Sequence, residues 1–134
     1  MRRSLGRSGI EISALGMGCW AIGGPWSDGE VPLGWGEVDD EESIRAIHAA
    51  LERGVDFFDT ANVYGAGHSE VVLGPAFEGR RDQVVIATHS DQALALLDDR
   101  TDAEANILGV IPYQENQTVL HCDESLLPSK KAAW

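Results

Sequence analysis

The chain has 134 residues, a one-domain length, and 43% of them are apolar. Its net charge of −12 argues against binding to nucleic acid or to an anionic membrane surface, which needs clustered lysines and arginines. With no apolar run near the ~20 residues of a membrane span, no secretory signal and only two cysteines, the sequence predicts a cytoplasmic protein without a metal or disulfide framework.

The first part of the chain begins with a predicted strand, a long loop and a helix. Residues 12–18 are a short apolar run that ends in glycines. A loop rich in glycine, tryptophan and proline follows over about residues 20–37. Residues 39–54 predict a helix, because apolar residues recur there at helical spacing and Asp39 and Glu42 resemble a capping box.

Two further apolar runs alternate with a second helix. Residues 55–61 predict a buried strand that ends near a carboxylate, and residues 83–88 predict another. Between them, residues 67–77 predict a helix with Ser69 as its N-cap. Near-continuous apolar strands that alternate with helices favour parallel β/α units. The expected fold class is α/β, an open fold of about three parallel strands followed by a short mixed α/β tail.

The second part of the chain differs in composition. Residues 1–90 hold 14 of the 15 glycines, whereas the remainder is rich in Ala, Leu, Asp, Asn and Gln. Residues 90–99 and 101–110 predict helices, the second capped by Thr101, and residues 117–123 predict a strand. The shift in composition indicates two segments of different origin.

A carboxylate and a phenol follow the second predicted strand. Asp59 ends that strand, and Tyr64 follows five residues later. Active sites of parallel β/α folds gather at the carboxyl ends of strands, and a phenol there could transfer a proton if a nearby lysine lowered its pKa from ~10. Taken alone, the pair fits better with an Asp59 that caps a turn and a Tyr64 that packs.

Three stretches together resemble the N-terminal part of the aldo-keto reductase family: "LGRSGIEISALGMGCWAIGG", "FFDTANVYGAGHSEVVLG" and "RRDQVVIAT". The resemblance covers about residues 3–88. It implies part of a (β/α)₈ barrel and an oxidoreductase that reduces aldehydes and ketones with NADPH. In that family, the nicotinamide supplies hydride and a tyrosine supplies the proton.

The resemblance assigns roles to individual residues. Tyr64 matches the family's proton donor, and Asp59 matches the aspartate that pairs with the catalytic lysine. The end of the first strand, which lies near the nicotinamide, is matched by Gly18, Cys19 and Trp20. The resemblance therefore implies that Gly18, Cys19, Trp20 and Asp59 contact the cofactor.

His89 stands where the family has its lysine. It is interpreted as a functional replacement, as an inert substitution, or as the first residue of a different segment. The last interpretation is favoured, because residues 84–134 resemble an internal piece of FAD-dependent amine-oxidase-like proteins, in "VVIATHSDQALALL" and "ILGVIPYQENQTVLHCDESLLPSKKAAW". The glycine fingerprint for FAD is absent from the sequence, so FAD is not expected. The predicted organisation is a reductase-like segment over residues 1–88 and a fragment over residues 89–134 that is not an independent domain.

The resemblance thus implies an aldo-keto-reductase-like oxidoreductase, truncated or chimeric, with very low activity towards a small carbonyl substrate. Two alternatives are a non-catalytic fusion or truncation product and a fragment of an FAD-dependent amine-oxidase-like protein. Without the lysine, Tyr64 is expected to keep a pKa near its free value. The exposed edges of a three-stranded sheet predict self-association.

Overall fold

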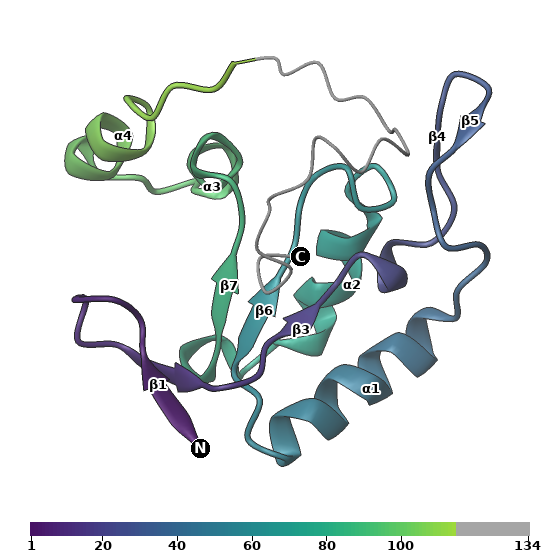
Figure 1. The fold of residues 1–134 in the computed structure, drawn as a ribbon, viewed down its shortest axis with the longest axis horizontal. Coiled ribbons are helices and arrows are strands. Elements are labelled where there is room, and N and C mark those ends of the chain that lie inside the picture. The colour runs from purple at the N-terminus through teal and green to yellow at the C-terminus, as the bar shows by residue number, and fades with distance from the viewer. Residues whose placement is uncertain (115–134) are drawn as a thin grey trace, which may run out of the picture.

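The computed structural model describes residues 1–114, which build a parallel sheet, two small hairpins and four α-helices (Figure 1). The sheet has the order β3-β6-β7, with strands Met17–Gly18, Phe57–Asp59 and Val85–Ala87. The helices are α1 (Asp40–Glu52), α2 (His68–Ala76), α3 (Ser90–Leu96) and α4 (Asp102–Leu108). The hairpins are β1–β2 (Arg2–Ser4, Glu11–Ser13) and β4–β5 (Ser27–Asp28, Val31–Pro32). Two short 3₁₀ turns complete the described chain, η1 (Ala21–Gly23) and η2 (Arg81–Gln83).

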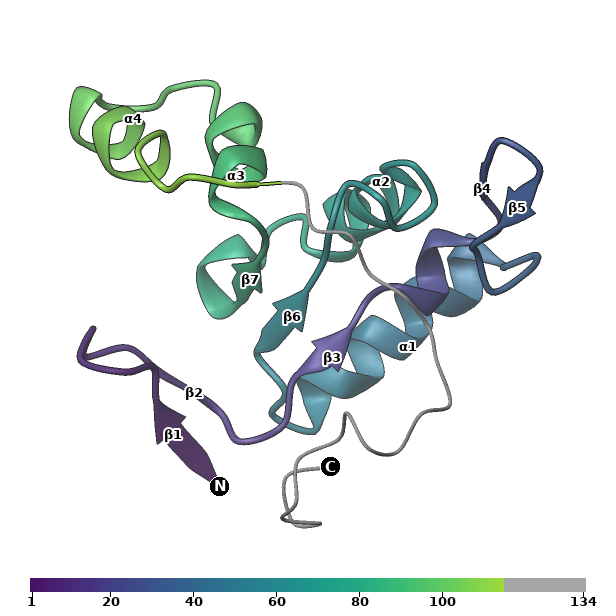
Figure 2. The same cartoon turned by 45° about the horizontal axis from the view of Figure 1, so that its top comes forward.

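The three central strands run parallel, as the alternation of apolar runs and helices predicted. Strand β6 pairs with β3 on one side and with β7 on the other. Helices α1 and α2 pack against each other, while α3 and α4 lie together beyond the carboxyl end of β7 (Figures 1 and 2). The α/β fold class predicted from the sequence is confirmed.

The core lies between the sheet and the helices α1 and α2. Phe58 from β6 is fully buried, and its ring meets that of Phe77 edge-on at 4.8 Å between centroids. Ile47 from α1 and Val72 from α2 are buried in the same cluster. Burial of such side chains is the main favourable term in folding, so this cluster holds α1 and α2 on the sheet.

The predicted strand over residues 12–18 is wrong in extent, because the chain divides into β2 and β3. The division follows from Ser13, whose backbone N–H donates to the Asp56 side chain over 2.6 Å. The Ser13 hydroxyl also accepts from the Asp56 backbone N–H at 3.1 Å. These two bonds tie the end of β2 to the residue before β6, and the strand resumes only at Met17.

The helix ends test the predicted caps. Helix α1 begins as expected, with the Asp39 side chain accepting from the backbone N–H of Glu42 at 2.9 Å. Thr101 caps α4 in a complete capping box, also as expected. Ser69 does not cap α2, since the helix begins at His68 after Gly67 in the N-cap position. Ser69 is buried instead, and its hydroxyl faces the sheet.

The long loop after β3 contains structure that the sequence did not predict, namely η1 and the β4–β5 hairpin. The strand predicted over residues 117–123 lies outside the described residues. None of the helices in the described part of the chain has the length and apolar character to cross a membrane.

Candidate active site

The carboxyl ends of β3 and β6 lie side by side in the sheet. Gly18 pairs with Asp59 in the parallel register, and Asp59 pairs with Ala87 of β7. The Cys19 backbone N–H continues the ladder by donating to the Asp59 carbonyl over 2.9 Å. The register therefore places Gly18 and Asp59 side by side at the carboxyl ends of their strands, and Cys19 and Trp20 follow directly after β3.

Tyr64 reaches this edge from the turn that follows β6. Its hydroxyl donates to Oδ2 of Asp59 over 3.2 Å. The turn itself is held by a 2.8 Å bond from the Tyr64 backbone N–H to the Ala61 carbonyl. The Asp59 carboxylate is exposed, whereas Tyr64 is half-buried. The structure thus brings together the phenol and the carboxylate that the sequence singled out.

Aromatic rings enclose one side of the Tyr64 phenol. The Trp20 indole stacks on Tyr64, with 6.0 Å between ring centroids and 19° between planes. Trp35, from the loop before α1, meets Trp20 edge-on at 5.6 Å. Trp35 was not among the predicted site residues, and the only signal for it was the gathering of tryptophans in that loop. The Trp20 and Trp35 rings thus form a partly exposed aromatic surface beside the Tyr64–Asp59 pair.

The pKa of Tyr64 is raised above its ordinary value of 10.0, first by burial and then by the negative charge of Asp59. The hydrogen bond to Asp59 acts in the same direction, because it stabilises the protonated phenol. The expectation that Tyr64 would keep a pKa near its free value is therefore wrong. At neutral pH the side chain is a protonated phenol and a weaker acid than free tyrosine.

Cys19 is fully buried. Burial raises the pKa of its thiol to about 12, and the nearby carboxylates of Asp59 and Glu70 add to the shift. The thiol is thus neutral and unreactive at neutral pH. Its backbone carbonyl has a clearer role, since it accepts from the buried Ser69 hydroxyl over 3.0 Å.

His89 lies just beyond β7 and does not join the Tyr64–Asp59 pair. Its ring stacks on Tyr113 at 5.0 Å between centroids, with an interplanar angle of 13°. Its Nδ1 lies 4.0 Å from Oδ1 of Asp91. Within residues 1–114, no hydrogen bond or ion pair links His89 to Asp59 or Tyr64. The described contacts of His89 therefore do not support its interpretation as a functional replacement for the lysine.

His68 is a structural residue of the site. Its Nδ1–H donates to the Gly23 carbonyl over 3.0 Å, and its Nε2–H donates to Oδ2 of Asp40 over 3.1 Å. The ring joins η1 to the first turns of α1 and α2. The pKa of His68 is raised, first by the bond to the Gly23 carbonyl and then by Asp40, because both partners favour the imidazolium.

Protonated His68 is expected to stabilise the fold at acidic pH. Because its pKa is raised above 6.5 in the folded state, this stabilisation is fully present below pH 6.5 and is lost as pH rises through the folded pKa. His68→Gln should therefore lower the urea midpoint more at about pH 5.5 than at about pH 8.5. Asp40→Asn should shrink the difference between the two pH values, and a pH-independent effect of His68→Gln would contradict the assignment.

A second polar network links α2 to the ends of β3 and β6 through buried hydroxyl groups. The Thr60 and Ser69 hydroxyls, both buried, lie 3.0 Å apart. Ser69 then donates to the Cys19 carbonyl, as described above, so α2 is bonded to the ends of both β3 and β6. Sequence reasoning missed this network, because a serine near a helix start is more often a cap than a buried donor.

Comparisons of this chain with known proteins all point to one protein family. Residues 14–108 match the family model "Aldo/keto reductase family". Over 115 residues, the chain is 39% identical to "Aldo-keto reductase YhdN" of Bacillus subtilis (strain 168). That alignment covers 84% of this chain and 32% of the relative, so the chain spans about a third of that protein's length.

Solved structures give the same result. The structure "aldo-keto reductase AKR11C1 from Bacillus halodurans (holo form)" superposes with a TM-score of 0.52 at 31% identity, covering 65% of this chain and 24% of that one. A putative aldo-keto reductase from Pseudomonas aeruginosa gives a TM-score of 0.53 at 24% identity, covering 81% of this chain and 42% of that one. The second likeness concerns the fold alone.

The family match corrects one boundary predicted from the sequence. The resemblance was expected to end at residue 88, yet the matched range continues through α3 and α4 to residue 108. His89 lies inside that range. Position 89 is therefore part of the matched family segment.

Proposed function

The chain belongs to the aldo/keto reductase family, and we propose from this premise that it carries the proton-donating part of a carbonyl-reducing site, with Tyr64 as the donor. We also propose that β3, β6 and β7 correspond to the first three strands of the family's barrel. The observation that carries the proposal is the 3.2 Å hydrogen bond from Tyr64 to Asp59 at the carboxyl ends of adjacent parallel strands.

The chemistry that these residues offer is acid catalysis on a polarised oxygen. A protonated phenol can donate to a carbonyl oxygen that becomes more basic during reduction. Asp59 holds the phenol in place through its hydrogen bond, and Trp20 limits the access of water on one side. Gly18 and Cys19 contribute backbone to the same edge of the sheet.

NADPH is the cofactor that family membership implies, and it would supply the hydride. The described residues do not fit a tightly held dinucleotide. Its phosphates need cationic partners, yet Arg2, Arg45 and Arg81 are bonded to Asp56, Glu41 and the Val84 carbonyl, away from the Tyr64–Asp59 pair. The only two lysines, Lys130 and Lys131, lie outside the described residues. We therefore propose weak NADPH binding and very low activity.

The raised pKa of Tyr64 supports the same conclusion. A lysine ammonium would lower it, whereas burial and the carboxylate of Asp59, which has no ion pair among residues 1–114, raise it. A donor with a pKa far above the working pH transfers its proton less readily.

The proposal is tested by following NADPH consumption with a small aldehyde. We expect turnover far below the ~10 per second of a typical enzyme, and quenching of tryptophan fluorescence only at millimolar NADPH. Tyr64→Phe should remove the remaining turnover. Tyr113→Phe is the matched control, because Tyr113 bonds to Ser90 and is not part of the pair. A turnover number within tenfold of the typical value would overturn the proposed low activity, and equal rates in Tyr64→Phe would overturn the donor role.

A non-catalytic chain is the second candidate, favoured by the lack of a cation beside Asp59 within the described residues. It predicts zero turnover in both the parent chain and Tyr64→Phe. An amine-oxidase-like origin of residues 84–134 stays a prediction, and its first part lies within the range matched by the reductase family. Cytoplasmic location and self-association through the exposed sheet edges stay predictions as well.

A further inference from the structure

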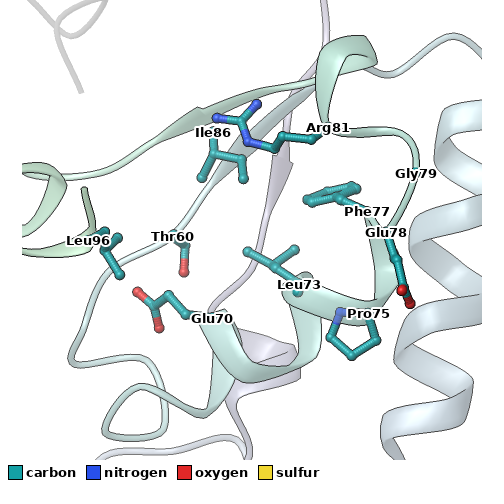
Figure 3. A pocket seen from close by; sticks show the side chains of 11 residues that line it. Thr60, Glu70, Leu73, Pro75, Phe77, Glu78, Gly79, Arg81, Ile86 and Leu96 are labelled. Atoms are coloured by element: carbon teal, nitrogen blue, oxygen red, sulfur yellow. The ribbon is translucent and has the colours of Figure 1, made fainter. Parts of the chain in front are cut away.

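A cavity of about 630 Å³ lies beside α2, and Tyr64 and Asp59 are not among its lining residues. Figure 3 shows the side chains of Leu73, Phe77, Ile86 and Leu96 directed towards it. These residues come from α2 and its end, from β7 and from α3. The volume falls in the range of small-molecule sites, which are mostly apolar with a few polar groups that set orientation.

One polar group of this cavity has an unmet bonding requirement. The Oε2 atom of Glu70, in the first turn of α2, is buried and has no hydrogen-bond partner. An unpartnered buried carboxylate oxygen costs free energy that a donor from a ligand would recover. Glu70 also lines a second cavity of about 280 Å³, which shares Leu96 with the first. Glu70 and Leu96 are therefore common to the linings of both cavities.

The charges around the cavity favour a cation at the Glu70 end. Glu70 brings a carboxylate to that end, whereas the other two charged residues of the lining, Glu78 and Arg81, lie on the far side of it (Figure 3). Arg81 lies at the end of the cavity away from Glu70 (Figure 3), and its Nη1 donates to the Val84 carbonyl over 2.8 Å. The net charge of the whole chain, −12, acts in the same direction.

We propose that this cavity binds small amphipathic ammonium compounds, with the ammonium donating to Oε2 of Glu70 and the apolar tail packed against Leu73, Phe77 and Ile86. A charge-assisted bond to a carboxylate is about twice as strong as a neutral one. The inference concerns a site separate from the Tyr64–Asp59 pair, and it stands whether or not the chain reduces carbonyls.

The test is calorimetric titration of the full chain with octylammonium, 1-octanol and octanoate, which share the same tail. Octylammonium is expected to bind about tenfold more tightly than the other two. In Glu70→Gln, which keeps the shape of the side chain, octylammonium should bind no better than 1-octanol. Glu78→Gln is the matched control for charge and should change affinity by less than about twofold.

A second variant keeps the test decisive if Glu70→Gln fails to fold. Leu96 is 59% exposed, so Leu96→Trp should fold normally while its larger ring fills the space between the two cavities. It should abolish binding of all three compounds. The proposal is overturned if octylammonium shows no saturable binding, if octanoate binds equally well, or if Leu96→Trp leaves the affinity unchanged.

Discussion

Gly65→Ala is expected to lower the free energy of unfolding by about 2–4 kcal/mol and to displace Tyr64. Gly65 has a left-handed backbone conformation with φ of +64°, and a Cβ there would overlap the Gly23 carbonyl. The reverse contact is equally tight, since a Cβ on Gly23 would lie 2.6 Å from the carbonyl carbon of Tyr64. The turn that holds Tyr64 rests directly on η1, and urea denaturation measures the cost of moving it.

Gly67→Ala separates the cost of the left-handed backbone conformation from the cost of the overlap with Gly23. Gly67 also has a positive φ, of +93°, but a Cβ there meets nothing within 4 Å. The control should cost only the backbone term of about 1–2 kcal/mol and leave carbonyl reduction, if measurable, unchanged. Equal losses in the two variants would show that the contact with Gly23 is not what constrains the turn.

His89→Lys is expected to lower the pKa of Tyr64 by about 1–3 units. Position 89 follows β7, the neighbour of β6, and a lysine has the longer stem needed to bring an ammonium towards Asp59. That ammonium would offset the carboxylate that now raises the pKa of Tyr64. Turnover of a small aldehyde with NADPH should rise in the same variant, because the donor becomes a stronger acid.

The composition of the chain allows a direct measurement. Tyr64 and Tyr113 are its only two tyrosines, so Tyr113→Phe leaves Tyr64 as the sole phenol. Its pKa can then be read from tyrosinate absorbance during a pH titration. In this background, Tyr64 should titrate above 10.0, and His89→Lys should move the transition downwards. His89→Gln is the neutral control, and an equal shift in both variants would show that the ammonium is not responsible.

Local signals predicted the helices well. Asp39 and Thr101 cap α1 and α4 as their sequence patterns indicated, since a cap depends on residues only three positions apart. The alternation of apolar runs with helices predicted the parallel sheet. Where local signals competed with tertiary bonds they failed: Ser69 faces inward to Cys19, and Ser13 bonds to Asp56.

The candidate site divides in the same way. That Asp59 and Tyr64 lie together follows from their places in the chain, because strand register and a five-residue separation leave little freedom. Other features depend on which side chains fold over the strand ends. These are the contact of Trp20 with Trp35, the hydrogen bonds of His68, and the raised pKa of Tyr64.

The sequence by itself therefore determined the parallel alternation of strands and helices, the starts of α1 and α4, and the closeness of Asp59 and Tyr64, because each depends on spacing along the chain. Only the tertiary structure decided that His89 stacks on Tyr113 away from that pair, and that Glu70 keeps a buried oxygen without a partner. The physical reason is that burial and long-range contacts, which set both outcomes, depend on the packing of elements far apart in the sequence.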